Sequence, residues 1–228
     1  MKLSISMSRK EVIFGWLLMA GQLLILPVIA VTVNGVLPAP VSDAQMNIAL
    51  FVLEFLLATV IFRKFLKAST RLALCTPFRC LRFAALGLLL YYLGSFVVGL
   101  VIGYIDPDFS NINDSNISIL AQDNYTLMFL CTVLLVPVTE ELLYRGLIFR
   151  GLQKKNRLVA YLLSAVVFSL IHVVGYIGMT SSTTLLLCLL QYIPAGLSLC
   201  WAYEKADTIW APILMHMTVN QISISLMR

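Results

Sequence analysis

Two adjacent glutamates and an arginine stand in an otherwise apolar stretch, VPVTEELLYRGLIFR, residues 136–150. Glu141 and Arg145 lie one helical turn apart with the acid on the N-terminal side, which is the favourable order for an ion pair. Glu140 points about 100° away around the same helix. Arg145 can therefore hold Glu141 ionised while Glu140 exchanges protons, since carboxylates in different environments take different acid–base roles. Taken alone, the motif leaves open an ion pair that only closes a helix at the membrane surface.

The two histidines of the chain also lie in apolar stretches that we expect to be helical. His172 stands in FSLIHVVGY and His216 in APILMHMTVNQ, where Asn220 follows His216 by four residues. That spacing places His216 and Asn220 on one helical face. A single histidine in an apolar helix is usually a packing residue, but two of them beside two intramembrane glutamates indicate a shared polar site.

Glutamate, imidazole and amide side chains are the components of a hydrolytic site. A glutamate assisted by a histidine can deprotonate a water as a general base. An asparagine and a histidine can donate hydrogen bonds to the oxyanion of a tetrahedral intermediate. The chain has no G-x-S-x-G motif and no cysteine with an evident base partner. The residues therefore favour an activated water over a side-chain nucleophile.

The same residues leave a zinc site open as the alternative. Two histidines and a carboxylate could hold Zn²⁺ in a three-ligand catalytic site, but the H-E-x-x-H pattern is absent. We favour a site without a bound cofactor because Asn220 suits an oxyanion better than zinc. No two of the five cysteines form a CxxC pair, so neither a zinc finger nor a disulfide framework is expected.

The elements that must position these residues are membrane-spanning helices. Sixty per cent of the residues are hydrophobic and 12% are charged, against roughly 25% charged residues in soluble domains. A spanning helix needs about 20 apolar residues. We predict an all-α bundle of about seven spans in a single transmembrane domain, residues 1–228, with an interfacial helix after the fourth span as a variant. The spans are expected at about 11–33, 44–66, 81–105, 125–152, 157–175, 184–204 and 209–227.

Basic residues concentrate in alternate connections of this predicted bundle. Lys2, Arg9 and Lys10 precede the first span, and a basic cluster lies between the second and third spans. The positive-inside rule then predicts a cytoplasmic N-terminus. The segment 106–124 is rich in Asp and Asn and contains no basic residue, which is typical of an external loop.

Three motifs in the second half of the chain match, in order, those of a known protease family. E-E-L-L-Y-R (140–145), F-S-L-I-H (168–172) and H-M-T-V-N (216–220) fit E-E-x-x-x-R, F-x-x-x-H and H-x-x-x-N. About residues 125–225 thereby resemble the CPBP family of intramembrane proteases, which includes type II CAAX prenyl endopeptidases and bacterial Abi or bacteriocin-processing relatives. The first half of the chain resembles that family only in being hydrophobic spans.

The resemblance implies an intramembrane endopeptidase that hydrolyses membrane-associated peptides or proteins. Glu140 would be the base that activates a water, and His172 would hold the same water. His216 and Asn220 would polarise the scissile carbonyl and stabilise the oxyanion. The family has been described both as metalloproteases and as metal-independent glutamate proteases, so the resemblance leaves that choice open. Supporting roles would fall to Glu141 and Arg145.

The expected partners are a peptide or protein substrate within the membrane, the lipid bilayer and other membrane proteins, with no nucleic acid. The short chain resembles bacterial relatives, so a bacterial cell membrane is the expected location. Two other functions stay open: a non-catalytic scaffold or bacteriocin-immunity protein, and a proton-coupled transporter with a Glu and His relay. Glu54, near the middle of the second predicted span, could pair with Arg145, cap a polar cavity or line a substrate path.

Overall fold

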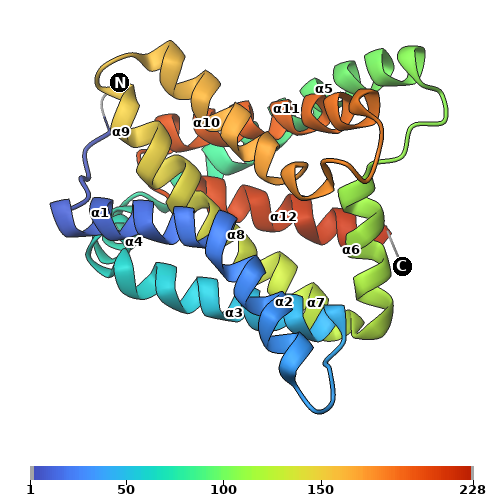
Figure 1. Ribbon diagram of the computed structural model, residues 1–228. Helices are drawn as coiled ribbons and strands as arrows, with labels where there is room; N and C mark the ends of the chain where they lie inside the picture. Colours follow the sequence, from blue (N-terminus) through green and yellow to red (C-terminus); the bar gives the residue numbers. More distant parts are fainter. Residues whose placement is uncertain (1–2, 227–228) are drawn as a thin grey trace.

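Helices form almost the whole of the described chain, residues 3–226, in a computed structural model (Figure 1). The predicted all-α bundle is confirmed, because the protein is 85% helical and the described residues contain no strand. Three of the elements are π-helical turns inside longer helices. In chain order the elements are α1 (Arg9–Ala20), η1 (Gly21–Ile25), α2 (Leu26–Val36), α3 (Asp43–Ile61), α4 (Arg63–Cys75), α5 (Pro77–Ile105), α6 (Ile112–Asp123), α7 (Tyr125–Leu130), η2 (Cys131–Leu135), α8 (Val136–Glu141), η3 (Leu142–Phe149), α9 (Arg150–Gln153), α10 (Arg157–Ile171), η4 (Val174–Tyr176), α11 (Ser182–Ala206) and α12 (Trp210–Leu226).

Five helices of the described chain are long and apolar enough to cross a membrane, so this is a multi-pass membrane protein. Helices stand at all of the predicted span positions, but two of them are short. α10 has 15 residues and α12 has 17. At about 1.5 Å per residue, neither reaches across a hydrocarbon core of about 30 Å without help from its neighbours. The five are Arg9–Val36, Asp43–Ile61, Pro77–Ile105, Tyr125–Gln153 and Ser182–Ala206.

The segment 106–124, predicted as an external loop, contains the helix α6. The side chain of Asn111 accepts hydrogen bonds from the backbone N–H groups of Asn113 and Asp114 and so caps the start of this helix. Leu120 and Ala121 of α6 are buried in a small apolar cluster with α3 and α7. The prediction of an irregular loop was wrong because Asn and Asp favour loops and helix caps alike, and Asn111 caps a helix here. The external location of the segment stays a prediction.

The extra amphipathic helix lies before the third span and not after the fourth. The predicted second span ended at residue 66, whereas α3 ends at Ile61 and the chain turns at Phe62 into α4. The fourth span runs without a break to Gln153. One face of α4 is buried: the Ser69 hydroxyl lies 3.0 Å from the Thr208 hydroxyl. The basic residues of α4 fit a helix that lies in the membrane interface.

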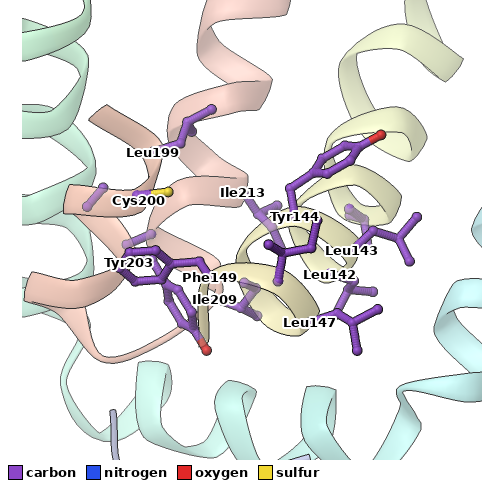
Figure 2. Packing of buried hydrophobic residues seen from close by; sticks show 14 of the residues in the cluster. Leu142, Leu143, Tyr144, Leu147, Phe149, Leu199, Cys200, Tyr203, Ile209 and Ile213 are labelled. Carbon is purple, nitrogen blue, oxygen red and sulfur yellow. The ribbon is translucent and has the colours of Figure 1, made fainter. Parts of the chain in front are cut away.

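The helix that carries the two glutamates occupies the centre of the bundle. Every residue of η3, Leu142–Phe149, is buried. Figure 2 shows Phe149 beside Tyr203 of α11, and the centres of the two rings lie 6.2 Å apart. The π-helical turn η2 ends at Leu135, two residues before Pro137, in agreement with the loosening that a proline imposes on a helix. In η2 the carbonyl oxygen of Thr132 accepts a hydrogen bond from the side chain of Asn220.

The close approach of α10 to α11 depends on Gly196. A Cβ at this position would lie 2.7 Å from both Cα and Cβ of Ala165. We expect Gly196→Ala to push the helices apart and to lower the free energy of unfolding by about 1–3 kcal/mol, the usual cost of overpacking. Thermal unfolding in detergent measures the change. Gly99→Ala is the control, since nothing lies within 4 Å of its added Cβ; equal loss in both variants would contradict the prediction.

Candidate active site

The four residues predicted to be catalytic line one cavity of about 260 Å³. Glu140 comes from α8, His172 caps the end of α10, and His216 and Asn220 come from α12. The cavity is walled further by α6 and α11. Three segments that lie far apart in the sequence thus present an acid, two imidazoles and an amide to one space. The catalytic roles of these residues stay predictions.

The predicted pair of Glu141 and Arg145 is buried and includes a third member. Arg145 Nη1 donates to Glu141 Oε1 at 2.8 Å, and both side chains are 0% exposed. His216 Nδ1 lies 2.9 Å from the same oxygen. Because an ionised carboxylate only accepts, Nδ1 carries the proton. The His216 Nε2 atom then faces Glu140, whose Oε2 lies 3.9 Å away.

Sequence reasoning missed the contact between His216 and Glu141. The two residues are 75 positions apart, and no spacing rule joins side chains on different helices. Glu141 was assigned to Arg145 alone because residues four apart on a helix are neighbours. In the structure Glu141 fixes the orientation of an imidazole of the proposed site, while Arg145 neutralises its charge.

The ring of Phe168 packs against the buried arginine and against both histidines. The Arg145 guanidinium carbon lies 4.4 Å from the centre of its ring. The rings of His172 and His216 lie 4.7 Å and 5.8 Å from it. Phe168 precedes His172 by four residues, and the two side chains pack side by side. The aromatic residue of the F-x-x-x-H motif thus holds an Arg cation on its face and shapes the wall of the cavity.

The protonation of His172 follows from its backbone partner. Its Nδ1 atom lies 2.7 Å from the carbonyl oxygen of Phe168. A carbonyl oxygen can only accept, so Nδ1 carries a proton and, in the neutral ring, Nε2 keeps a lone pair. His172 is therefore able to accept a hydrogen bond from a water, the property that its proposed role needs.

Asn220 and Glu140 both keep hydrogen-bonding capacity on the cavity. Asn220 Nδ2 donates to the carbonyl oxygen of Thr132 at 2.9 Å, a group of the π-helical turn η2. Its second N–H remains for a ligand. The Oε2 atom of Glu140 is buried and has no hydrogen-bond partner among the described residues. A buried polar atom without a partner is costly in a packed interior, which is consistent with a group reserved for chemistry.

The zinc alternative gains no support from the ligand geometry. Among the described residues, no group of three or more His, Cys, Asp or Glu side chains is placed to hold a metal ion. The imidazoles of His172 and His216 both line the cavity, but they do not form a three-ligand set with a carboxylate. We therefore derive no catalytic step through a metal.

Glu54 lies beside Glu140 and is not paired with Arg145, whose charge is taken by Glu141. Together with Gln22 and Thr139, the two glutamates line a second, small cavity of about 30 Å³. That volume exceeds the space that one water needs. Of the roles considered from the sequence, the capping of a polar cavity is the one that fits this position.

Comparisons with known proteins support the resemblance found in the motifs. Residues 122–222 match the family model described as "Type II CAAX prenyl endopeptidase Rce1-like". The chain is 30% identical over 95 residues to "Putative membrane peptidase YdiL" of Bacillus subtilis strain 168, covering 41% of this chain and 34% of that protein. It is 32% identical over 87 residues to "UPF0177 protein YxdF" of Lactococcus lactis subsp. lactis strain IL1403, covering 38% of this chain and 42% of that protein.

The family match over residues 122–222 includes the four residues predicted to be catalytic, and the two alignments span 34% and 42% of the lengths of the two bacterial proteins. No solved structure gives a significant match to the chain. The predicted resemblance is therefore confirmed: residues 122–222 of this membrane protein are similar to the Rce1-like family of type II CAAX prenyl endopeptidases.

Proposed function

We propose that the protein is an intramembrane endopeptidase that hydrolyses peptide bonds of membrane-associated peptides or proteins with a water activated by Glu140 and His172. The observation that carries the proposal is the single cavity lined by Glu140, His172, His216 and Asn220. The family match over the same part of the chain supports it, as does the peptidase name of one relative.

The first step is the attack of water on the scissile carbonyl carbon. Glu140 takes one proton of the water as general base, and His172 Nε2 accepts a hydrogen bond from its other O–H group. The water oxygen forms a bond to the carbonyl carbon, whose π electrons move to the oxygen. When the tetrahedral intermediate collapses, the carbon–nitrogen bond breaks, and Glu140 returns its proton to the leaving amine nitrogen.

The negative oxygen of the intermediate needs hydrogen-bond donors. Asn220 offers its second N–H, because the first is held by the carbonyl oxygen of Thr132. His216 has its ring fixed by Glu141 through Nδ1, which keeps Nε2 on the cavity side. When the ring carries both protons, Nε2 donates to the oxyanion. Donors that are oriented before the reaction stabilise the transition state without reorganisation.

The proposal is tested with purified protein in lipid vesicles that contain synthetic apolar peptides of about 25 residues, with the products identified by mass spectrometry. We expect defined cleavage by the wild type, undiminished by a metal chelator, and its loss in both Glu140→Ala and His172→Ala. The matched control is Ser223→Ala, since Ser223 lines the cavity outside the motifs, and it should cleave normally.

Equal cleavage by wild type, Glu140→Ala and His172→Ala would remove the protease assignment. Cleavage that the chelator abolishes and Zn²⁺ restores would replace the metal-free mechanism by a metal-dependent one. A proton flux across the vesicles that depends on Glu140, without any cleavage, would support the transporter alternative.

A further inference from the structure

One wall of the cavity is a tyrosine that stacks on a histidine. The rings of His172 and Tyr192 lie 4.3 Å apart with an angle of 29° between their planes. Tyr192 belongs to α11, outside the three motifs that carry the family resemblance, and it lines the same cavity as the motif residues. The side chain of Tyr192 therefore covers one face of the His172 imidazole, and none of the sequence motifs includes Tyr192.

The hydroxyl group of Tyr192 is itself held by α6. It donates to Asp114 Oδ1 at 2.8 Å and accepts from Asn113 Nδ2 at 3.0 Å. The neighbouring Gln191 accepts from Asn111 Nδ2 at 2.8 Å. Two consecutive residues of α11 thus bind the capped start of α6. In Figure 1, α6 stands at the same end of the bundle as the end of α12.

The start of α6 faces the cavity rather than the surroundings alone. Asn113, Asp114 and Ile117 all line it. Burial raises the pKa of the Asp114 carboxyl, and the hydrogen bond from Tyr192 opposes that rise. Burial of a carboxyl group is unfavourable unless the group is hydrogen-bonded. A helix that only connected two spans would not require a buried acid, which suggests a role for Asp114 and its donor Tyr192 in the site.

The imidazole of His172 requires support from a neighbouring side chain because its own contacts hold it weakly. The residue stands at the C-cap of α10, where the helix ends. Within the described chain its side chain makes one hydrogen bond, between Nδ1 and the carbonyl oxygen of Phe168. That bond fixes one edge of the ring, but the ring can still swing about it. A stacked neighbour whose far end is anchored removes this motion.

We propose that Tyr192 and Asp114 form a positioning pair that holds the imidazole of His172 in its reactive orientation. This inference rests on the proposed function, since the water that His172 orients is the one that Glu140 activates. The pair extends the active site to α6, so the polar segment between the third and fourth predicted spans takes part in catalysis. Neither residue touches the reacting atoms; both act through His172.

The first test observes His172 directly. Because the chain has two histidines, selective ¹⁵N-histidine labelling gives two imidazole groups, which a His216→Gln variant assigns. Tyr192→Phe and Asp114→Ala each break the hydrogen bond between Tyr192 and Asp114 but keep the stacked aromatic ring. We expect both to change the ring nitrogen signals of His172 and to leave those of His216 in place.

Asp123→Ala is the matched control. Asp123 is the last residue of α6, and it accepts a hydrogen bond from Ser42, away from the cavity. This variant should alter neither imidazole. Unchanged His172 signals in both Tyr192→Phe and Asp114→Ala would overturn the proposal, as would equal changes in Asp123→Ala.

The second test divides kcat from KM in the vesicle assay. Tyr192→Leu, which removes the stack, should lower kcat by about 30-fold with KM nearly unchanged, since small misplacements of reacting groups are costly. Tyr192→Phe and Asp114→Ala should each lower kcat by about 5-fold. The double variant should lose no more than either single one, because both break the same bond. Additive losses, or a rise in KM alone, would contradict a positioning role.

The two tests fail separately from the proposed function. The labelling experiment does not depend on cleavage. It therefore shows whether Tyr192 and Asp114 position the His172 ring even if no peptide is hydrolysed. Cleavage by the wild type combined with unmoved His172 signals would overturn the pair and leave the protease assignment intact. Moved signals in a protein that cleaves nothing would overturn the protease assignment.

Discussion

Glu140→Gln is expected to lower kcat for peptide cleavage by about 10²–10⁴-fold, the usual contribution of a general base. The amide has the shape of the carboxyl group but cannot take a proton from water. The fold should survive, because Oε2 of Glu140 makes no hydrogen bond to the described residues. The rate in lipid vesicles and the thermal unfolding temperature measure the two effects on one preparation.

Glu54→Gln is the matched control for this prediction. Glu54 is also an acid within a spanning helix, and it touches the small cavity next to Glu140 but not the large one. We expect a much smaller loss of kcat for this variant. A Glu140→Gln protein that cleaves nearly as fast as the wild type would contradict the assignment of Glu140 as the general base. Equal losses of kcat in both variants would contradict the assignment of that role to Glu140 alone.

Arg145→Met is expected to cause the largest loss of stability, about 3–5 kcal/mol, because it leaves a buried carboxylate without its counter-charge. Arg145 and Glu141 are both 0% exposed. The guanidinium also donates to the carbonyl oxygen of Gly196 at 3.3 Å and lies on the ring of Phe168. Arg145→Lys should recover little of the lost stability, since an ammonium group lacks the planar set of donors by which the guanidinium contacts all of these partners at once.

Unfolding titrations in mixed detergent micelles measure this loss. The double variant Glu141→Gln with Arg145→Met removes both charges and should recover part of the stability. It should still lack activity, because His216 loses the carboxylate that orients its ring. Arg71→Met, at an exposed position of α4, should leave unfolding unchanged. A single Arg145→Met variant as stable as the wild type would show that the buried pair is not a structural requirement.

The spacing of the motif residues was the part of the site that the sequence could predict. Glu140 with Glu141 and Arg145, and His216 with Asn220, are related by helical periodicity alone. The strongly apolar composition required helices, since lipid offers backbone groups no partners. These two constraints suffice to place the four proposed catalytic residues on helices that can meet.

Contacts between helices were the part that the sequence could not predict. The bond between Tyr192 and Asp114 joins residues 78 positions apart, and the contact between His216 and Glu141 joins residues 75 apart. Neither has a local signature, because each depends on how whole helices pack. The helix α6 was missed for a different reason: Asn111 serves as a cap, and the same residue type is common in loops.

The central claim is that the peptide bond is broken in the 260 Å³ cavity. Ser223 lines that cavity three residues beyond Asn220, so a Ser223→Cys variant can be blocked there with a maleimide. The background carries Cys75→Ser, because Cys75 is the exposed free cysteine of the described chain. We predict that unmodified Ser223→Cys cleaves normally and that cleavage falls in proportion to the modified fraction. Full modification with cleavage at the unmodified rate would contradict the account.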